Sequence, residues 1–522
     1  MKLVIVHHHF RPGGVRRVIE LATPHLVAHW PERVRSVVLA AGEAPDAAWL
    51  QAFRQRLSGT PVQLVVNPAF GYLSESAPRG RSLEPLASRG IWKLLREIGW
   101  KRDCLIWAHN LGLGRNLYLS RALTSICHAA CIPLVAHHHD WWFDNRWHHF
   151  AAMREPGFRT LRALAGAVLH VSPLISHVAV NQHDAKVLEK HFPGLAGWLP
   201  NPSESVARPR AARVEAARAW LGQQLGDDAQ VWLLPCRLLR RKNIAEALLL
   251  TRWLRPGAWL VTTGGVSSAE EQPYADRLLA AAQTQGWRLR LGILHGDENQ
   301  KPSVPELLAA SETVLLTSLQ EGFGLPYLEA AAARRPLVAR SLPNIAPDLA
   351  KFGFKFPQCY REVWVDPSLF DWHSERDRQA RWFAQWRGLM PDAAGRLAGK
   401  PAVLASGRNP RPVPYSRLSL TAQLEVLAQP LEQSWERCAP LNPFLRTWHE
   451  RALAGRLKVS PWPPSAARWL GGRAYARRFL QLVPPLFSRA PDAGAGRAAQ
   501  ADFLRRKLRS ENLYPLLWTS SV

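Results

Sequence analysis

The sequence predicts an α/β protein with two consecutive Rossmann-like domains and a mostly helical C-terminal extension. Two observations support this fold class. Short apolar runs typical of buried parallel strands recur along the chain, and stretches typical of helices follow them. The 522 residues are also too many for one ordinary hydrophobic core, which suggests two domains and an appendage.

The predicted strands fall into two sets, separated by the Pro- and Asn-containing stretch Trp198–Ser205. The first set is Leu3–Val6, Ser36–Leu39, Val62–Val66, Cys104–Ala108, Pro133–Ala136 and Ala167–Val171. The second set is Val231–Leu234, Trp259–Thr262, Arg290–Leu294, Val314–Thr317 and Leu337–Ala339. We therefore place one domain at residues 1–200 and another at 201–410. We expect a substrate cleft between them, because such sheets bind ligands beyond the carboxyl ends of their strands.

The remainder of the chain is predicted to be helical. The segment 411–430 is expected to contain a helix, Tyr415–Ala428, that closes the fold by crossing back onto the first domain. Residues 431–522 form a basic extension in which short helical pieces alternate with Pro-rich breaks. Its last segment sets Phe503 and Leu504 beside several arginines, which favours a tail packed on the first domain. A helix lying in a membrane interface remains the alternative.

The amino-acid composition limits the classes of binding partner but does not select one of them. Lys and Arg total 67 against 41 acidic residues, a formal charge of +26. This excess of positive charge favours an anionic binding partner: a nucleotide diphosphate, a phosphorylated acceptor, a membrane surface or a nucleic acid. The six cysteines include no C-x-x-C pair, as in a cytosolic protein with reduced thiols. No apolar run reaches the length of a transmembrane helix, and the apolar start is too short for a signal peptide. We expect a cytoplasmic protein, and peripheral contact with the inner face of the membrane stays open.

The most informative segment is Gln320–Ala330, QEGFGLPYLEA, directly after an apolar strand. Glycines allow a tight turn and close approach to a ligand, and Pro326 suits the first turn of a helix. The free N–H groups of that helix N-terminus can meet an anion. Glu321 and Glu329, eight positions apart, can bind hydroxyl groups on either side. The pattern predicts a site for a nucleotide sugar.

A second segment, Leu234–Leu250, carries cations at the end of a predicted strand. Asn243 and Glu246 predict an N-cap and a capping box for the next helix. Arg237 and Lys242 then lie in the preceding loop, where fixed cations can stabilise the charge that grows on a departing diphosphate. The neighbouring Arg240 and Arg241 are assigned no specific role.

The Gln320–Ala330 segment resembles the E-x7-E motif of retaining glycosyltransferases with the GT-B fold, in particular glycosyltransferase family 4. The Leu234–Leu250 segment is similar to that family's G-R-L-x-x-x-K-N pattern, although Cys236 stands where glycine is common. The resemblance implies that Glu321 binds hydroxyls of the donor sugar and Glu329 those of the ribose. It also implies that Arg237 and Lys242 contact the diphosphate. Donor-facing backbone is expected at Gly322, Phe323, Gly324 and Leu325.

A third segment, Ile132–Trp147, is an apolar strand followed by three histidines and an aspartate. These residue types are metal ligands. Adjacent strand residues point to opposite faces, however, so consecutive histidines seldom converge on one ion and no metal site is expected. The resemblance to family 4 matches His139 and Asp140 to an H-D pair, and implies that His139 hydrogen-bonds the transferred sugar.

Two weaker signals follow other first-domain strands. Gly13 and Gly14 form a turn before a helix, and the resemblance places that glycine loop beside the diphosphate and acceptor. His109 and Asn110 end another strand and, with Asp140, are candidates for the acceptor pocket. In the second domain, the run Thr262–Ser268 is a candidate for approach to the nucleotide.

Together these patterns predict a retaining transfer of a sugar from a UDP- or GDP-linked donor to a hydroxyl acceptor, anionic or lipid-linked, in glycan biosynthesis. The catalytic candidates are Glu321, Arg237, Lys242 and His139. No dedicated base and no divalent metal is expected, because an oxygen of the diphosphate can itself take the acceptor proton. No other cofactor and no specific nucleic acid is expected either. Three alternatives stay open: a GT-B-like epimerase, a phosphorylase and a non-catalytic polyanion-binding protein. A glycosidase, which also pairs two carboxylates, has no use for the cationic pair.

Overall fold

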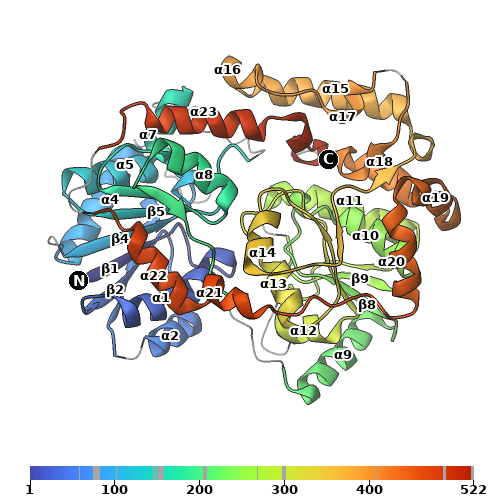
Figure 1. Ribbon diagram of the computed structural model, residues 1–522, viewed down its shortest axis with the longest axis horizontal. Coiled ribbons are helices and arrows are strands. Elements are labelled where there is room, and N and C mark those ends of the chain that lie inside the picture. The colour runs from blue at the N-terminus through green and yellow to red at the C-terminus, as the bar shows by residue number, and fades with distance from the viewer. Residues whose placement is uncertain are drawn as a thin grey trace. The chain divides into compact units, whose positions relative to one another are not determined.

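The computed structural model describes residues 1–57, 59–73, 83–100, 103–144, 147, 150, 158–203, 209–266, 268–296, 301–407, 409–485 and 490–518. The chain divides into two compact units, each containing a parallel sheet and helices (Figure 1). The first unit comprises Met1–Glu204, Leu389–Leu397 and Ser465–Lys507. The second comprises Ser205–Gly388, Ala398–Pro464 and Leu508–Val522.

The first unit contains a parallel sheet in the order β3-β2-β1-β4-β5-β6-β7. Its strands are β1 (Lys2–Val6), β2 (Ser36–Ala41), β3 (Val62–Val66), β4 (Cys104–His109), β5 (Leu134–His138), β6 (Ile175–Ala179) and β7 (Ala196–Trp198). Its helices include α1 (Gly14–His29), α2 (Ala47–Arg56), α4 (Leu83–Glu97), α5 (Leu117–Ala129), α7 (Leu161–Val168), α8 (Gln182–His191), α21 (Ala467–Leu470), α22 (Gly472–Leu482) and α23 (Ala495–Lys507). Strand residues such as Leu3, Leu39 and Trp107 form its buried core.

The second unit contains a parallel sheet in the order β10-β9-β8-β11-β12-β13, with a small antiparallel pair, β14 and β15. The strands are β8 (Val231–Leu234), β9 (Trp259–Thr262), β10 (Leu289–Arg290), β11 (Thr313–Leu316), β12 (Leu337–Arg340), β13 (Gln358–Tyr360), β14 (Trp364–Val365) and β15 (Val413–Pro414). The helices include α9 (Ala211–Leu225), α10 (Ile244–Leu254), α11 (Gln272–Thr284), α12 (Val304–Ala310), α13 (Leu325–Ala332), α14 (Ala346–Phe352), α15 (Trp372–Gly388), α18 (Leu420–Ala428), α19 (Leu431–Cys438) and α20 (Pro443–Leu453).

Both sheets have the strand order of a Rossmann fold. The order reverses between β1 and β4 in the first sheet and between β8 and β11 in the second. Loops that leave the two central strands diverge at such a point, and ligands bind there at the carboxyl ends of the strands. The predicted α/β class, with two Rossmann-like sheets and a helical C-terminal region, is confirmed.

Two strand predictions need correction. The run Ala167–Val171 is not a strand, because it begins inside the last turn of α7, and the next strand is β6. A short apolar run at the end of a buried helix cannot be told from a strand by its periodicity. The strand expected at Arg290–Leu294 ends at Arg290, and Gly292 then turns the chain with a φ of 63°.

The C-terminal extension contributes to both units. Its helix α22 packs on α1, and α23 packs on α7 and α8. Phe503 and Leu504 of α23, candidates for a membrane face, are buried within the first unit, where Phe503 lies against Trp141. Helix α18 lies in the second unit against α10 and α11. No helix in the described ranges combines the length and apolar character needed to cross a bilayer.

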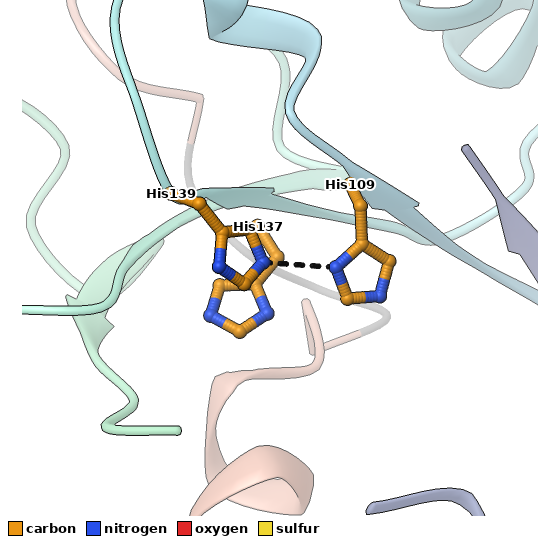
Figure 2. Close-up of side chains that lie close together, drawn as sticks. All are labelled: His109, His137 and His139. Atoms are coloured by element: carbon orange, nitrogen blue, oxygen red, sulfur yellow. Dashed lines mark hydrogen bonds between the residues drawn. The ribbon is translucent and has the colours of Figure 1, made fainter. Parts of the chain in front are cut away.

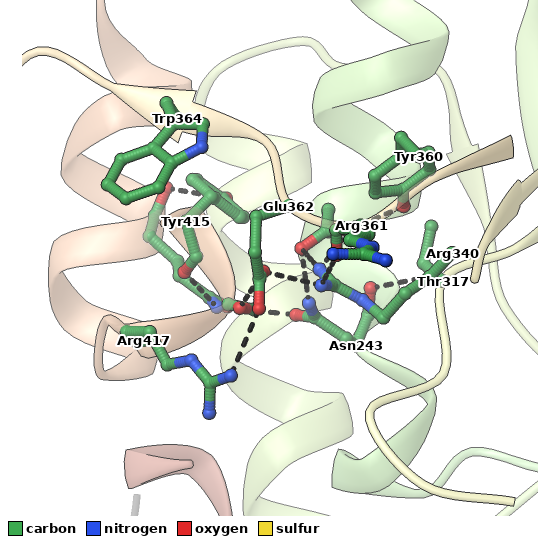
Figure 3. A network of polar contacts seen from close by, with 12 residues as sticks. Asn243, Thr317, Arg340, Tyr360, Arg361, Glu362, Trp364, Tyr415 and Arg417 are labelled. Carbon is green, nitrogen blue, oxygen red and sulfur yellow. Dashed lines mark hydrogen bonds and ion pairs between the residues drawn. The ribbon is translucent and has the colours of Figure 1, made fainter. Parts of the chain in front are cut away.

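A buried polar network joins β12 to α10 in the second unit (Figure 3). The guanidinium of Arg340 forms an ion pair with Glu246 at 2.5 Å and another with Glu362. Tyr360 also donates to Glu246, and Arg417 pairs with Glu362 at 3.0 Å. Because Glu246 and Arg340 are almost fully buried, neither charge can be left without its partner at low cost.

The substitution Glu246→Ala is expected to destabilise the second unit by about 3–5 kcal/mol, because it removes the fully buried partner of Arg340 and leaves that guanidinium with Glu362 alone. Thermal denaturation followed by circular dichroism measures the effect. Glu432→Ala is the matched control, since Glu432 is exposed on α19 and should leave the midpoint nearly unchanged. Equal midpoints for Glu246→Ala and Glu432→Ala would contradict the account of this network.

Candidate active site

The strongest candidate site lies where the second sheet reverses its strand order. The loop after β8 and the loop after β11 leave adjacent parallel strands at the same carboxyl edge. The first loop ends in a 3-10 turn, Arg240–Lys242, and the second carries Glu321. The two motifs found in the sequence therefore meet at the position where this class of sheet binds ligands.

Glu321 holds two cations at this edge. Its Oε1 accepts a short hydrogen bond from the Lys242 ammonium, and its Oε2 lies 3.0 Å from a guanidinium nitrogen of Arg241. Arg241 also donates to the Gln320 carbonyl oxygen at 2.8 Å. The side chains of Lys242 and Glu321 are each only 9% exposed, so water screens this pair weakly. We call Arg241, Lys242 and Glu321 the cation–carboxylate cluster.

The cations determine the protonation of Glu321. Burial by itself would raise the pKa of the carboxyl group, but the charges of Lys242 and Arg241 outweigh it and lower the pKa to about 2. Glu321 is therefore ionised at neutral pH. An ionised carboxylate accepts hydrogen bonds from hydroxyl groups and cannot itself act as a general acid.

The backbone beneath Lys242 is fixed by two buried residues. Thr317 donates its hydroxyl to the carbonyl oxygens of Lys242 and Asn243, at 2.9 and 3.1 Å. Asn243 adopts a left-handed conformation with φ of 49°. The predicted capping box is wrong, because the Asn243 side chain caps no backbone N–H and instead donates to the Glu246 carboxylate at 2.8 Å. Glu246, which also pairs with Arg340, thus links this loop to the Arg340 network.

Helix α13 begins directly beyond Glu321. Gly324 is its N-cap, with φ of 79°, and an added Cβ would lie 2.9 Å from the Tyr327 ring. Only glycine suits that position, and Pro326 occupies the first turn as expected. Phe323 is buried, whereas Glu329 on α13 is partly exposed. The N-terminal backbone of α13, including Gly322 and Leu325 on either side of the turn, leaves N–H groups suited to an anion.

Sequence reasoning missed Arg240 and Arg241 and singled out Arg237. Arg241 shares Glu321 with Lys242, and Arg240 is buried in an ion pair with Glu271 at 3.1 Å. Arg237 is exposed in the same loop. Consecutive basic residues look alike in a sequence, so only their partners on other loops distinguish them.

The predicted glycine run after β9 comes close to the same loop. The Gly264 N–H donates to the Cys236 carbonyl oxygen at 2.8 Å, and the Leu238 N–H donates to Gly265 at 3.1 Å. A Cβ on Gly264 would lie 3.0 Å from the Arg237 side chain, and one on Gly265 would overlap the ring of His295. The glycines therefore allow two loops to pass in contact.

In the first unit, the candidates from β4 and β5 come together. Asn110, with a left-handed φ of 58°, accepts hydrogen bonds from the backbone N–H groups of His139 and Asp140 at 2.9 and 3.2 Å. His109 and Asn110 are buried, whereas Asp140 is partly exposed. Gly14 is exposed at the start of α1. Asn110 thus holds the exit of β5 against the end of β4.

One group of side chains in the described ranges has the spacing of a metal site. His109, His137 and His139 each offer a ring nitrogen, and these nitrogens lie within 4.8 Å of one another. Consecutive strand residues point to opposite faces, and this expectation holds for His138. Its ring stacks on Trp141 and His177 and does not join the three histidines of that group. That expectation overlooked that His137 on β5 and His139, just beyond its end, lie two positions apart and share a face with His109 of the neighbouring strand.

Residues 223–364 match the family model described as Glycosyl transferases group 1. This range contains the cation–carboxylate cluster and Glu329. This part of the chain is therefore similar to a glycosyl transferases group 1 domain, and the two Rossmann-like sheets agree with the GT-B fold.

Two curated relatives are similar over a longer range. Mannosylglucosyl-3-phosphoglycerate synthase of Petrotoga mobilis is 24% identical over 352 residues, which cover 66% of this chain and 65% of the relative. Mannosylglucosylglycerate synthase of Thermotoga maritima is 24% identical over 280 residues, 49% of this chain and 61% of the relative. The chain thus spans somewhat less than two thirds of the length of each. Among solved structures, Anabaena Alr3699/HepE in complex with UDP-glucose has 17% identity and a TM-score of 0.47, with 87% of this chain and 98% of that chain covered.

Glu321 is expected to stabilise the fold above its ordinary pKa of 4.5 and to lose this effect as the pH falls towards its folded pKa of about 2. The stability difference between the wild type and Glu321→Gln should be constant near neutral pH. It should shrink by up to about 3 kcal/mol on acidification. Urea denaturation at a series of pH values measures it, with Glu432→Gln as the exposed control. A difference that does not change with pH would show that the two cations do not act on Glu321.

Proposed function

We propose that this protein is a retaining, metal-independent glycosyltransferase that moves a sugar from a UDP- or GDP-linked donor to a hydroxyl acceptor. The observation that carries the proposal is the cation–carboxylate cluster, which lies at the strand-order reversal of the second sheet and within the matched glycosyl transferases group 1 range. Its two cations suit the diphosphate of a nucleotide sugar, and its ionised carboxylate suits the hydroxyl groups of the sugar.

The cations have a specific use in this reaction. As the bond between sugar and diphosphate breaks, negative charge grows on the phosphate oxygen that leaves. Lys242 and Arg241 are held in place before the reaction by Glu321 and by the Gln320 carbonyl oxygen. Cations fixed in advance in a weakly screened site stabilise the transition state more than the ground state. Arg237, exposed in the same loop, is proposed as a further diphosphate contact.

The acids and the helix N-terminus recognise the rest of the donor. We assign the sugar hydroxyls to Glu321 and the ribose hydroxyls to Glu329, following the resemblance of the E-x7-E segment. The N–H groups at the start of α13 face the donor phosphates. The departing phosphate oxygen accepts the acceptor proton from the same face, so the anomeric configuration is retained without a dedicated base.

The first unit supplies the remaining roles by the same resemblance. His139 hydrogen-bonds the transferred sugar, and Gly14 offers backbone at the exposed start of α1. His109, Asn110 and Asp140 are proposed on the acceptor side. The acceptor is proposed to be anionic, consistent with the net charge of +26 and with the phosphoglycerate in the name of the Petrotoga mobilis relative. A cytoplasmic location, with or without peripheral membrane contact, completes the proposal.

Nucleotide binding can be tested by thermal shift with a panel of nucleotide sugars. A donor present at about a hundredfold excess over its Kd should stabilise the protein by about 2.7 kcal/mol and raise the melting temperature. Glu329→Ala should weaken that shift, because the ribose hydroxyls lose their acceptor. If no UDP- or GDP-linked sugar shifts the wild type, the transferase proposal is wrong.

Turnover should depend on the two cations. Lys242→Ala and Arg241→Ala are each expected to reduce kcat by about a hundredfold or more, on the scale of a lost oxyanion donor. Arg288→Ala is the matched control, because Arg288 is a half-exposed arginine of the same unit that pairs with Asp227. Its kcat should equal that of the wild type. Full activity of the Arg241→Ala, Lys242→Ala double variant would remove the cluster from the mechanism.

A further inference from the structure

Three histidines gather at the carboxyl ends of β4 and β5 (Figure 2). His137 and His139, two residues apart on the same face, have ring centroids 4.4 Å apart. His109 comes from the neighbouring strand and points its ring toward them, with Nδ1 3.0 Å from Nε2 of His139. The three side chains therefore direct ring nitrogens into one small volume.

These ring nitrogens make few hydrogen bonds for buried polar atoms. Within the described part of the chain, Nε2 of His109 lacks a hydrogen bond of normal geometry, and the ring of His137 has only a weak contact with the Leu199 backbone. His109 and His137 are at most 1% exposed, and the Trp107 ring lies beside both. Buried polar atoms without partners are costly and rare in native proteins, so a group of them at one point calls for a bound species.

The ligand type suits a transition-metal ion. Each imidazole ring can offer a nitrogen lone pair, and several histidines commonly hold such an ion together. The three rings come from two paired strands and the residue that follows one of them, so their nitrogens can converge on one point.

We propose that His109, His137 and His139 bind one divalent transition-metal ion of the Zn²⁺ class. Three imidazole nitrogens leave a fourth tetrahedral position for water or an anion, as in other three-histidine sites. Two nitrogens about 2.0–2.1 Å from a tetrahedral ion lie roughly 3.3 Å apart. The pair His109–His139 is already near this spacing at 3.0 Å, and a nitrogen of the His137 ring lies within 4.8 Å of both.

The surroundings favour an ion with a net positive charge. Asp140 directly follows His139 and is partly exposed, so a carboxylate lies next to the ligand set. Asn110 accepts hydrogen bonds from the backbone N–H groups of His139 and Asp140, which fixes the backbone that carries the His139 ring. Under the proposed function, an ion on His139 competes with the donor sugar for that ring.

Direct binding of Co²⁺ to the chelator-treated, full-length protein tests the site without any nucleotide sugar, so the outcome does not depend on the proposed transfer reaction. One equivalent of Co²⁺ should produce the visible bands of a tetrahedral ion, and Zn²⁺ should displace it. His137→Asn should weaken binding by more than about a hundredfold, since loss of outer partners alone costs about 10- to 100-fold.

His138→Asn is the matched control, because His138 is equally buried on the same strand and faces the other way. It should bind Co²⁺ like the wild type. If the wild type binds no Co²⁺, or if His137→Asn binds as tightly as the wild type, the proposal is wrong. If His137→Asn does not fold, X-ray absorption of the wild type with Zn²⁺ decides. Three imidazole nitrogens at about 2.0–2.1 Å support the site, and a shell without imidazole overturns it.

Discussion

The candidate active site depends on the binding of two cations by one buried carboxylate. Glu321 comes from the loop after β11, and Lys242 and Arg241 come from the loop after β8. Removing one partner of a buried ion pair costs about 3–5 kcal/mol, because the other charge is left in a poorly solvated position. Glu321 therefore keeps the loops together and holds the cations at the sheet edge. In the proposed reaction, a diphosphate bound at this edge meets cations that are already in place.

The rest of the second unit supports that arrangement. The backbone of Lys242 is held by Thr317, and Asn243 connects to Glu246 and through it to Arg340. These residues do not face the cluster, yet they decide where its lysine can be. A rigid charged group gains catalytic value because little reorganisation is needed when charge develops on the substrate. In the proposed reaction, the buried network acts by positioning Lys242 and not by contact with the substrate.

Much of the fold could be predicted from the sequence, because buried parallel strands are short apolar runs and Rossmann-like sheets repeat them. The runs at Val231–Leu234 and Trp259–Thr262 correspond exactly in their bounds to β8 and β9. A turn containing Gly324 and a helix with Pro326 in its first turn were predicted from backbone preferences, and α13 begins at Leu325. Ala167–Val171 was mistaken for a strand, since an apolar helix end has the same composition.

The candidate site was less predictable, because its contacts join loops far apart in the sequence. Nothing local distinguishes Arg241 from Arg240, and yet one pairs with Glu321 and the other with Glu271. In the same way, His109 has no sequence signal linking it to His139, and only the pairing of β4 with β5 brings them together. The sequence could predict which residue types occur at the candidate sites. Their contact partners could be known only from the pairing of the strands.

The most direct test of the central claim is a crystal structure of the protein with a bound nucleoside diphosphate, UDP or GDP. The account predicts a phosphate oxygen within about 2.7–3.2 Å of the Lys242 ammonium or the Arg241 guanidinium, with the ribose hydroxyls at Glu329. A diphosphate bound elsewhere, with both cations still paired to Glu321, would contradict it.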